Sequence, residues 1–346
     1  MYKLKILVGM SGGVDSTYAA LKLLDEGHEV VGAVLVMHEY TEIDSAVAAA
    51  EKLGIPLVKI DCTSAFEKTV KSYFSNEYAA GRTPNPCIVC NREVKFKYLA
   101  SYARENGFDR IATGHYARIV ETNDGFAVSR AVDSTKDQTY MLYRLPREVL
   151  KMLVLPLADE VKTDVKARAE ARGIIEPDVK ESQEICFIPD NDYRSYIEEK
   201  LGKFPEGCFV DDKGRPIGKH RGIIGYTVGQ RKGLGVSLGQ RAFVSRIDPK
   251  RNEVTLSTEK PLTKVFTASD LVYSGLAPLS EGQSIRADVK IRYHAAPTIA
   301  TVTAIGKETV RIEIDEPKGL VAPGQSVVVY DGDTVLFGGF IDSAIH

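Results

Sequence analysis

The residues that most clearly point to chemistry form a short glycine-rich segment, GMSGGVDS, at positions 9–16. Its two adjacent glycines would let the backbone approach an anion closely, with the N–H groups pointing inward. Ser11 and Ser16 offer hydroxyls, and the Asp15 carboxylate is of the type that holds Mg²⁺ against phosphates. A helix predicted from Thr17 would place its positive end at the same point. The segment predicts a phosphate site; the simpler alternative is a plain tight turn, and the lysine of a Walker A loop is absent.

Cysteines supply the second kind of chemistry. Cys87 and Cys90 form a CxxC pair within GRTPNPCIVCN, and Cys186 follows much later in ESQEICFIP. A CxxC pair alone is compatible with half a zinc site, a redox pair or part of an iron–sulfur site. No second CxxC or HxxxH completes a zinc site, so the partner must be Cys186 if the fold brings it near.

The surroundings of the CxxC pair predict a rigid loop, with a helix following from about Val94. The helix N-terminus would favour a thiolate, as would Arg82, Arg92 and Lys95. The other two cysteines are expected to be small buried hydrophobic residues: Cys62 and Cys208.

These residues lie in a stretch where predicted strands and helices alternate. The expected strands are 5–10, 30–37, 57–61 and 111–113, and the expected helices are 17–26, 43–53, 66–78, 94–106 and 161–172. This alternation predicts an α/β fold with a doubly wound parallel sheet, where ligands bind at the carboxyl ends of the strands. Segments 118–120 and 126–129 predict a hairpin appended to that sheet.

The composition divides the chain into three predicted domains. Residues 1–202, with 26 basic and 31 acidic side chains, form the catalytic domain. Residues 203–264 carry 13 basic against 6 acidic side chains, a net +7, and are rich in glycine, which predicts a small mixed domain. Residues 265–346 predict a small antiparallel β-barrel. Its five expected strands are 284–292, 298–305, 309–314, 326–330 and 334–341.

Charge gives a first indication of the partner. The 346 residues carry a formal net charge of −2, which by itself argues against a nucleic-acid binder. The basic middle domain reverses this argument, because Lys and Arg are the main ligands of backbone phosphates. Arg231 and Lys232, in the glycine-rich stretch 222–240, are therefore expected RNA contacts. A solvated basic face is the alternative.

Several classes of protein are excluded. No window reaches the ~18 apolar residues that span a bilayer. The first residues lead directly into a strand and do not resemble a signal peptide. The five cysteines, an odd number, do not make a disulfide framework. We expect a cytoplasmic protein with no membrane partner.

Six motifs occur in a characteristic order: GMSGGVDS (9–16), GRTPNPCIVCN (81–91), ATGHYAR (112–118), KDQTYML (136–142), SQEICFI (182–188) and YTVGQRKGLG (226–235). The first is similar to the pyrophosphatase loop of the ATP-pyrophosphatase, or PP-loop, superfamily, whose catalytic domain has an adenine nucleotide alpha-hydrolase-like fold. Together the motifs resemble the tRNA-specific 2-thiouridylases of bacteria and mitochondria. The resemblance extends to VAPGQSVVVY (321–330) and so covers essentially the whole chain.

The resemblance implies an enzyme, a tRNA-uridine 2-sulfurtransferase that uses ATP and Mg²⁺. ATP would adenylate the C2 oxygen of the wobble uridine and release pyrophosphate, and sulfur would then displace AMP. By resemblance, Cys186 carries a persulfide, Cys90 is the nucleophile and Asp15 holds Mg²⁺. The ATP-binding residues implied are Gly9, Met10, Ser11, Gly12, Gly13, Val14, Asp15, Ser16, Met37 and Gly114.

The resemblance also implies two partners, tRNA and an upstream sulfur donor. The donor would be a cysteine desulfurase or a sulfur-relay protein. The target base must leave its stack to reach the ATP site. His115 would lie near the flipped uridine, with a structural histidine as the alternative. The implied tRNA-binding residues are His115, Lys136, Asp137, Gln138, Arg292, Tyr293 and Gln325.

One position departs from the family pattern. Where many members have an aspartate in NPDxxCN, this sequence has Cys87. The aspartate's role as a base or orienting group therefore cannot be carried over. Cys87, Cys90 and Cys186 could instead hold a [4Fe–4S] cluster with one iron open to sulfide, as in related tRNA thiolases. The alternative is that Cys87 is a spare thiol and that sulfur transfer uses a persulfide and ends in a Cys90–Cys186 disulfide.

Two other functions remain open. Another PP-loop ATP-pyrophosphatase could act on a small metabolite, but the chain has no glutaminase domain and its basic segment would have no purpose. A non-catalytic nucleotide-binding regulator associated with RNA would leave Cys90 and Cys186 without a role.

Overall fold

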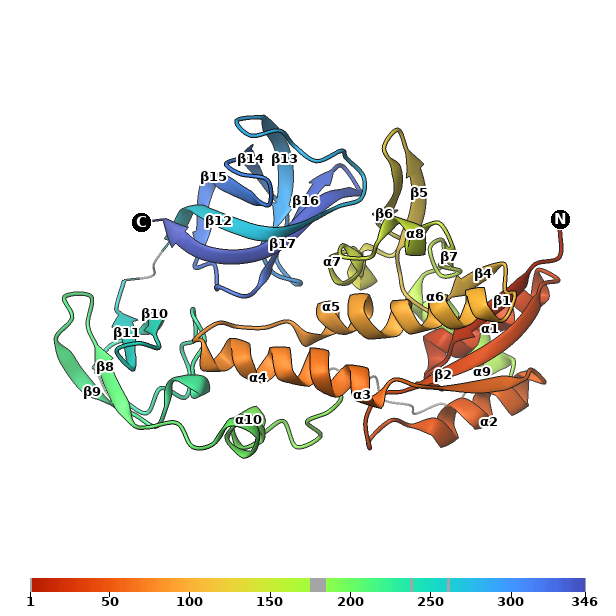
Figure 1. Ribbon diagram of the computed structural model, residues 1–346, viewed down its shortest axis with the longest axis horizontal. Helices are drawn as coiled ribbons and strands as arrows, with labels where there is room; N and C mark the ends of the chain where they lie inside the picture. Colours follow the sequence, from red (N-terminus) through yellow and green to blue (C-terminus); the bar gives the residue numbers. More distant parts are fainter. Residues whose placement is uncertain (1, 175–184, 237–238, 260–261, 346) are drawn as a thin grey trace.

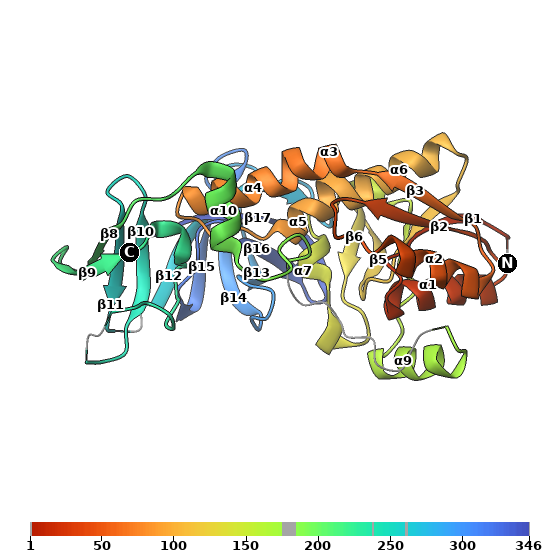
Figure 2. The same ribbon diagram turned by 90° about the horizontal axis from the view of Figure 1, so that it is seen from below.

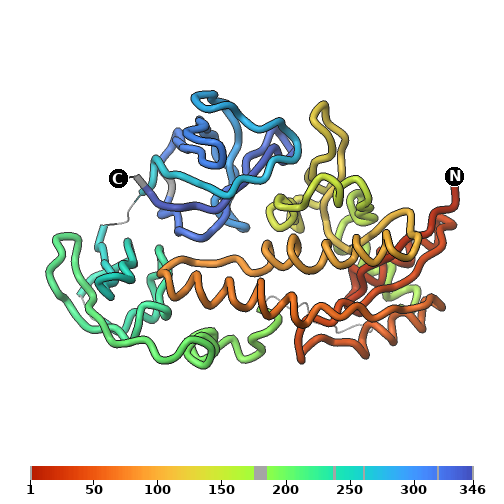
Figure 3. The backbone as a smooth tube through the Cα atoms, viewed as in Figure 1, coloured from red at the N-terminus to blue at the C-terminus, as the bar shows by residue number. Residues whose placement is uncertain are grey.

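The computed structural model describes residues 2–174, 185–236, 239–259 and 262–345, which form three sheets (Figure 1). A parallel sheet lies near the N-terminus, a four-stranded sheet in the middle of the chain and a β-barrel at the C-terminus. Two long helical stretches run side by side from the parallel sheet toward the central sheet, and the barrel lies over them (Figures 1 and 3). Among the described residues, no helix combines the length and the apolar character needed to cross a membrane.

The parallel sheet confirms the predicted doubly wound α/β fold. Its strand order is β3-β2-β1-β4-β7, and every neighbouring pair is parallel. Ile6 and Val8 of the central strand pack toward α1 and α2, whereas Leu7 packs toward α6, so both faces are covered (Figure 2). The strands are β1 (Lys5–Gly9), β2 (Glu29–Val36), β3 (Leu57–Asp61), β4 (Arg110–Ala112) and β7 (Leu153–Val154). The helices beside them include α1 (Val14–Asp25), α2 (Ile43–Leu53) and α9 (Lys162–Ala171).

Each of the two long helical stretches contains a π-helical segment. The first consists of α3 (Thr63–Phe66), η1 (Glu67–Lys71) and α4 (Ser72–Ala79), and the second of α5 (Pro86–Cys90), η2 (Asn91–Lys95) and α6 (Phe96–Glu105). The CxxC pair therefore lies in helix α5, and the expected rigid loop ahead of a helix from Val94 is wrong. Pro86 explains the early start, because its fixed φ and missing N–H suit the first helical position.

The predicted hairpin exists, but it belongs to another sheet. Strands β5 (Arg118–Thr122) and β6 (Gly125–Ser129) pair antiparallel, and Ser129 pairs with Thr334 of the barrel. The hairpin therefore extends the C-terminal barrel sheet. The prediction that it is appended to the parallel sheet is wrong. Three short helical segments follow it: η3 (Ser134–Lys136), α7 (Thr139–Leu142) and α8 (Arg147–Leu150).

The basic middle segment folds as a mixed sheet of order β10-β11-β8-β9. Its strands are β8 (Gly207–Val210), β9 (Pro216–His220), β10 (Phe243–Asp248) and β11 (Glu253–Ser257), with α10 (Tyr193–Leu201) before them and η4 (Ile223–Gly225) between β9 and β10. Phe209 and Leu256 of this sheet share one buried cluster with Phe74 of α4. The central sheet is therefore packed onto the catalytic domain.

The C-terminal barrel has one strand more than the five expected. It contains β12 (Leu262–Tyr273), β13 (Ser284–Lys290), β14 (Thr298–Ala304), β15 (Thr309–Gly319), β16 (Ser326–Asp331) and β17 (Thr334–Ile345), and the β12–β17 pairing closes it. Sequence reasoning missed β12, whose pairing is interrupted by register shifts and whose Asp270 has a φ of 52°. Such irregularities interrupt the alternation that identifies a strand.

Candidate active site

The phosphate loop joins the end of β1, at Gly9, to α1. Gly12 has a φ of 78°, and a Cβ there would lie 2.4 Å from the Ser45 backbone, so only glycine fits. Ser16 Oγ accepts a hydrogen bond from the Ser11 N–H (3.2 Å) and donates one to the Gly13 carbonyl (3.1 Å). These bonds hold the loop in one shape, with the N-terminus of α1 directly after it.

Helix α1 begins at Val14, three residues before the expected start, so Asp15 lies in its first turn. Gly114, which follows β4, packs against this turn: a Cβ on Gly114 would lie 2.5 Å from the Asp15 carbonyl carbon. Met10 and Val14 have buried side chains, which leaves their backbone as the part that can face a ligand. The structure thus brings the implied ATP residues of the loop and Gly114 together.

The Asp15 carboxylate is held by two donors. Lys162 Nζ lies 2.7 Å from both carboxylate oxygens, and Tyr116 Oη donates to Oδ1 at 2.9 Å. The backbone N–H of Lys162 donates to Asp133 Oδ2 (3.0 Å), which fixes the start of α9. Sequence reasoning missed Lys162. Its signal was its place in the first turn of the predicted helix 161–172, where a cation is unfavourable unless an acid offsets it.

The CxxC pair lies beside the ATP edge of the sheet. Cys87 is exposed, whereas Cys90 is only 4 % exposed. The Cys90 Sγ lies 3.7 Å from the Sδ of Met37, which directly follows β2. The carboxyl ends of parallel strands share one edge, so this contact places the thiol at the edge that carries the phosphate loop.

Cys186 is anchored on the same helical stretches. It is exposed, but the next residue, Phe187, is buried edge-on against Phe66 (5.5 Å between ring centroids) and Phe74 (5.4 Å). Both rings belong to the stretch that packs beside α5. The first part of the Cys186 motif, residues 182–184, lies outside the described residues.

One cation, Lys95 at the end of η2, interacts electrostatically with all three of these cysteines. Burial raises the pKa of Cys90 to about 12, and Lys95 opposes this shift. The pKa of Cys186 is also raised, chiefly by desolvation, and again Lys95 lowers it. The Cys186 side chain is exposed, whereas that of Cys90 is buried, so the two thiols lie in different surroundings.

The two arginines expected to favour thiolates are already paired with acids. Arg82 Nε lies 2.7 Å from Glu77, and Arg92 Nε lies 3.1 Å from Glu93. Of the other cysteines, Cys62 is buried as expected, whereas Cys208 in β8 is only half-buried.

His115 lies close to the same group of residues. Its Nδ1 is 2.8 Å from Thr113 Oγ1, and its ring is 5.6 Å from that of Phe96. Burial, together with Lys95, lowers the pKa of His115 to about 3, so the imidazole is neutral at physiological pH. A neutral ring suits contact with a base better than contact with a phosphate.

No metal site is found at the three cysteines in the described parts of the chain. Over the described parts of the chain, which include Cys87, Cys90 and Cys186, no group of three or more His, Cys, Asp or Glu side chains is placed to hold a metal ion. Cys90 is buried while the other two thiols are exposed. The structure therefore gives no support for the expected [4Fe–4S] cluster.

The implied tRNA segment 136–138 is partly internal. Lys136 ends η3. Asp137 is buried and accepts hydrogen bonds from the Thr139 N–H (3.0 Å), with Lys290 Nζ 3.5 Å away. Gln138 Oε1 accepts from the Tyr116 N–H at 2.8 Å. Because Tyr116 in turn holds Asp15, the segment is connected to the phosphate loop.

Of the other implied tRNA residues, Tyr293 and Gln325 lie where the barrel meets the catalytic domain, whereas Arg292 contacts the barrel domain itself. Arg292 donates to the Leu320 carbonyl. The ring of Tyr293 lies 6.1 Å from that of Tyr140. Gln325 donates to the carbonyl of Thr83. The fold thus collects residues from both halves of the chain at one interface.

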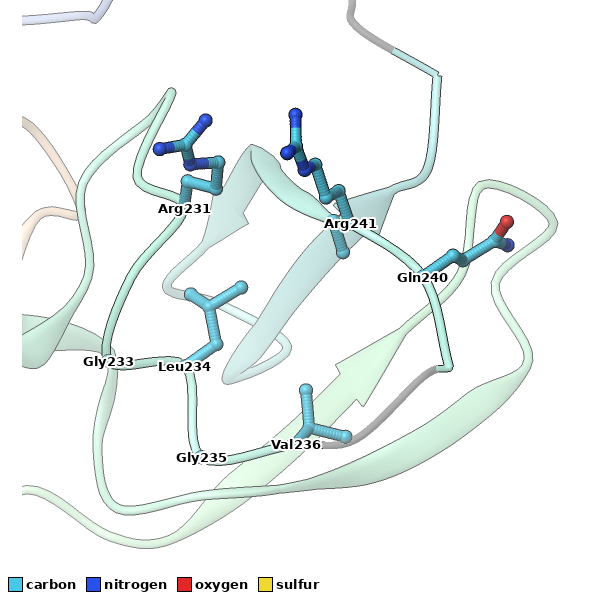
Figure 4. A pocket seen from close by; sticks show the side chains of 8 residues that line it. Arg231, Gly233, Leu234, Gly235, Val236, Gln240 and Arg241 are labelled. Atoms are coloured by element: carbon cyan, nitrogen blue, oxygen red, sulfur yellow. The ribbon is translucent and has the colours of Figure 1, made fainter.

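The basic central domain contains a cavity of about 460 Å³ lined by its glycine-rich loop. Arg231 and Arg241 lie on its rim, and Figure 4 shows their guanidinium groups directed to the same side. Lys232 is exposed beside them. Arg241 is a further candidate for phosphate binding that we had not singled out from the sequence.

Comparison with known proteins gives a family for each part of the chain. Residues 4–190 match a family described as a tRNA methyl transferase HUP domain, 194–258 a tRNA methyl transferase PRC-barrel domain and 263–341 an aminomethyltransferase beta-barrel domain. A 4-thiouridine synthetase solved with RNA and ATP is 18 % identical over 57 % of this chain and 50 % of its own, with a TM-score of 0.39. That likeness is too weak to bear on function.

Two curated relatives match almost the full length. The tRNA-specific 2-thiouridylase MnmA of Acetivibrio thermocellus is 44 % identical and covers 99 % of this chain and 100 % of its own. The protein of the same name from Carboxydothermus hydrogenoformans is 42 % identical over 99 % of this chain and 98 % of its own. Because these relatives match the whole length of the chain, and because it has the phosphate loop and the cysteines described above, the chain belongs to the tRNA-specific 2-thiouridylase family.

Proposed function

We infer that this protein is an ATP-dependent tRNA-uridine 2-sulfurtransferase, which replaces the C2 oxygen of the wobble uridine with sulfur. The relatives named tRNA-specific 2-thiouridylase support this class of enzyme. The observation that carries the proposal is the 3.7 Å contact between Cys90 Sγ and Met37 Sδ, because it puts a thiol beside the phosphate-binding edge. Activation by ATP followed by sulfur transfer requires both groups in one place.

Adenylation is the first step. The C2 oxygen of the uridine attacks the α-phosphate of ATP, and pyrophosphate leaves. The backbone around Gly12 and the N-terminus of α1 would bind the phosphates. Asp15 fits Mg²⁺, which proteins commonly bind through one or two carboxylates together with substrate phosphates. When bound, Mg²⁺ supplies charge neutralisation, and the Lys162 ammonium beside Asp15 adds a second positive charge.

Sulfur transfer is the second step. The terminal sulfur of a Cys186 persulfide attacks C2 and displaces AMP, which leaves the base joined to Cys186 through two sulfurs. The Cys90 thiolate then attacks the Cys186 sulfur, which releases 2-thiouridine and forms a Cys90–Cys186 disulfide. A thiol reductant restores the pair before the next turnover. Lys95 supports this role because its charge acts on both thiols.

We prefer the persulfide route to the cluster route, because no group of three metal-binding side chains is found among the described residues. Cys87, which is exposed, has no assigned step. The sulfur comes from a cysteine desulfurase or a sulfur-relay protein, which must reach the exposed Cys186. The cytoplasm is the expected compartment of this reaction.

Unmodified tRNA, ATP, Mg²⁺ and a sulfur donor, incubated with the protein, test the proposal. We expect 2-thiouridine in the nucleoside digest by mass spectrometry, with AMP and pyrophosphate as products. A methylated uridine would support the methyl transferase activity named in the domain descriptions and would refute the proposed sulfurtransferase function. Iron and sulfide assays on anaerobically purified protein decide between routes: iron-dependent thiolation would overturn the persulfide assignment.

Variants separate the two steps. Asp15→Ala should abolish pyrophosphate release, whereas Cys90→Ser and Cys186→Ser should stop sulfur transfer and leave adenylation intact. Cys208→Ser, a half-buried cysteine of the central sheet, is the matched control. Equal loss of adenylation in all three variants would contradict the roles assigned here.

A further inference from the structure

A turn of the C-terminal barrel holds the residues that lead into the nucleophile's helix. We call residues 323–325 the clamp turn and residues 83–85 the lead-in. The Thr83 N–H donates to the Pro323 carbonyl at 2.7 Å. Gln325 Nε2 donates to the carbonyls of Thr83 (3.0 Å) and Pro84 (3.4 Å). The lead-in thus has three hydrogen bonds to a strand end more than 200 residues away in sequence.

The clamp turn packs closely against the backbone of the lead-in. Gly324 has a φ of 87°, and a Cβ there would lie 3.0 Å from both N and O of Thr83. Ser326, the residue directly after the clamp turn, is fixed as well. The Ser326 carbonyl accepts from Tyr140 Oη at 2.8 Å, and its Oγ lies 2.9 Å from Tyr143 Oη. Both tyrosines are fully buried, so the clamp turn has a rigid base.

Helix α5 starts immediately after the lead-in. It has five residues, Pro86–Cys90, and its Asn85 cap makes no side-chain hydrogen bond to the helix. The position of its first turn therefore depends on contacts made outside the helix. A shift at Thr83 would pass through one turn to Cys90, whose Sγ must stay next to Met37.

We propose that Gln325 is a positioning residue for Cys90: its amide holds the Thr83 and Pro84 carbonyls and so aligns the nucleophile's helix in the free enzyme. This rests on the proposed function, in which Cys90 takes part in sulfur transfer. A primary amide has two N–H donors, and the amide nitrogen of Gln325 donates to two carbonyls here. The Oε1 of Gln325 is the part of its side chain left for a tRNA contact that keeps these bonds. The role is additional to the tRNA contact that the family resemblance implies.

Gln325→Met tests the proposal, because methionine keeps the length of the side chain and removes both donors. In the free enzyme, we expect iodoacetamide to alkylate Cys90 roughly tenfold faster, as expected from the loss of about one net hydrogen bond. At saturating tRNA, we expect single-turnover sulfur transfer to fall by a similar factor, while pyrophosphate release changes by less than about twofold. Gln325→Glu would point a carboxylate at the two carbonyls. It should also speed up the alkylation of Cys90 and slow sulfur transfer.

Gln283→Met is the matched control. Gln283 Oε1 accepts from the Ser280 N–H at 3.0 Å in another turn of the barrel, far from the lead-in in sequence. The Gln283→Met variant should show unchanged rates of Cys90 alkylation and of sulfur transfer. Melting temperatures show whether each variant folds. If either Gln325→Met or Gln325→Glu fails to fold, the rates of the other one test the proposal.

Weaker tRNA binding with unchanged Cys90 alkylation and an unchanged rate at saturating tRNA would overturn the inference and leave Gln325 as a tRNA contact alone. That outcome would not affect the proposed function. Conversely, a native enzyme that makes no 2-thiouridine would refute the proposed function, while alkylation of the free chain would still report whether Gln325 positions Cys90.

Discussion

The burial of Cys90 predicts an unusual dependence of its reactivity on pH. Its thiol is 4 % exposed, and burial raises its pKa from an ordinary 9.0 to about 12. Alkylation requires the thiolate, and each pKa unit changes the thiolate fraction about tenfold at pH values below both pKa values. The rise of about three units should therefore slow the alkylation of Cys90 about a thousandfold relative to an ordinary cysteine near pH 7.

Iodoacetamide labelling of the free enzyme measures the alkylation rate of Cys90 at each pH. Mass spectrometry reads the extent of labelling for each cysteine. Cys87 is the internal reference, because it lies in the same helix and is exposed. The rate at Cys90 should climb about tenfold per pH unit with no plateau up to about pH 10. A plateau between about pH 8 and 9, or a rate equal to that of Cys87 at neutral pH, would refute the reasoning.

The same shift affects stability, and its sign follows from linkage. Folding favours the protonated Cys90 thiol, so its contribution is fully present below the ordinary thiol pKa and is lost as the pH rises toward the folded pKa. Between about pH 8 and 10, the free energy of unfolding should fall more for the native chain than for Cys90→Ala. Urea unfolding at several pH values measures the difference, and parallel curves would contradict it.

Three further predictions concern charged residues. Lys162→Gln removes the cation beside the phosphate loop and should slow pyrophosphate release by roughly 10²–10³-fold, measured in single turnover; an unchanged rate would make Lys162 structural only. Lys95→Met should slow single-turnover sulfur transfer by roughly tenfold with adenylation intact, because it removes the charge that opposes the raised pKa of Cys90. Neutralising Arg231 and Lys232 together should weaken tRNA binding and reduce the slope of log affinity against log salt by about 2; an unchanged slope would return the segment to a solvated basic face.

Local features of the sequence were sufficient to predict the elements that carry the chemistry. The phosphate loop was predicted from its glycines and its place between a strand and a helix, and the parallel sheet from apolar runs that alternate with helices ending at glycine. These features act over a few residues, because backbone freedom and periodicity are local properties. The main local error was the CxxC helix, where Pro86 marked a start that we assigned eight residues too late.

The family resemblance listed site residues but did not indicate how they contact one another. Asp137 and Gln325 were implied to bind tRNA, yet here they make internal contacts with Thr139 and Thr83, and their tRNA role stays a prediction. Arg82 and Arg92 looked equivalent to Lys95 in sequence, but carboxylates neutralise both arginines. Pairing of this kind depends on side-chain packing between elements, which no spacing reveals.

The sequence by itself determined the chemical inventory of this protein: a phosphate loop, a pair and a distant single cysteine, and a basic middle domain. Only the tertiary structure decided which of these residues meet. It joins Cys90 to Met37 across 53 positions, Lys162 to Asp15 across 147 and Gln325 to Thr83 across 242. Such contacts arise when whole elements bury their apolar faces against one another, and a one-dimensional pattern does not encode the resulting distances.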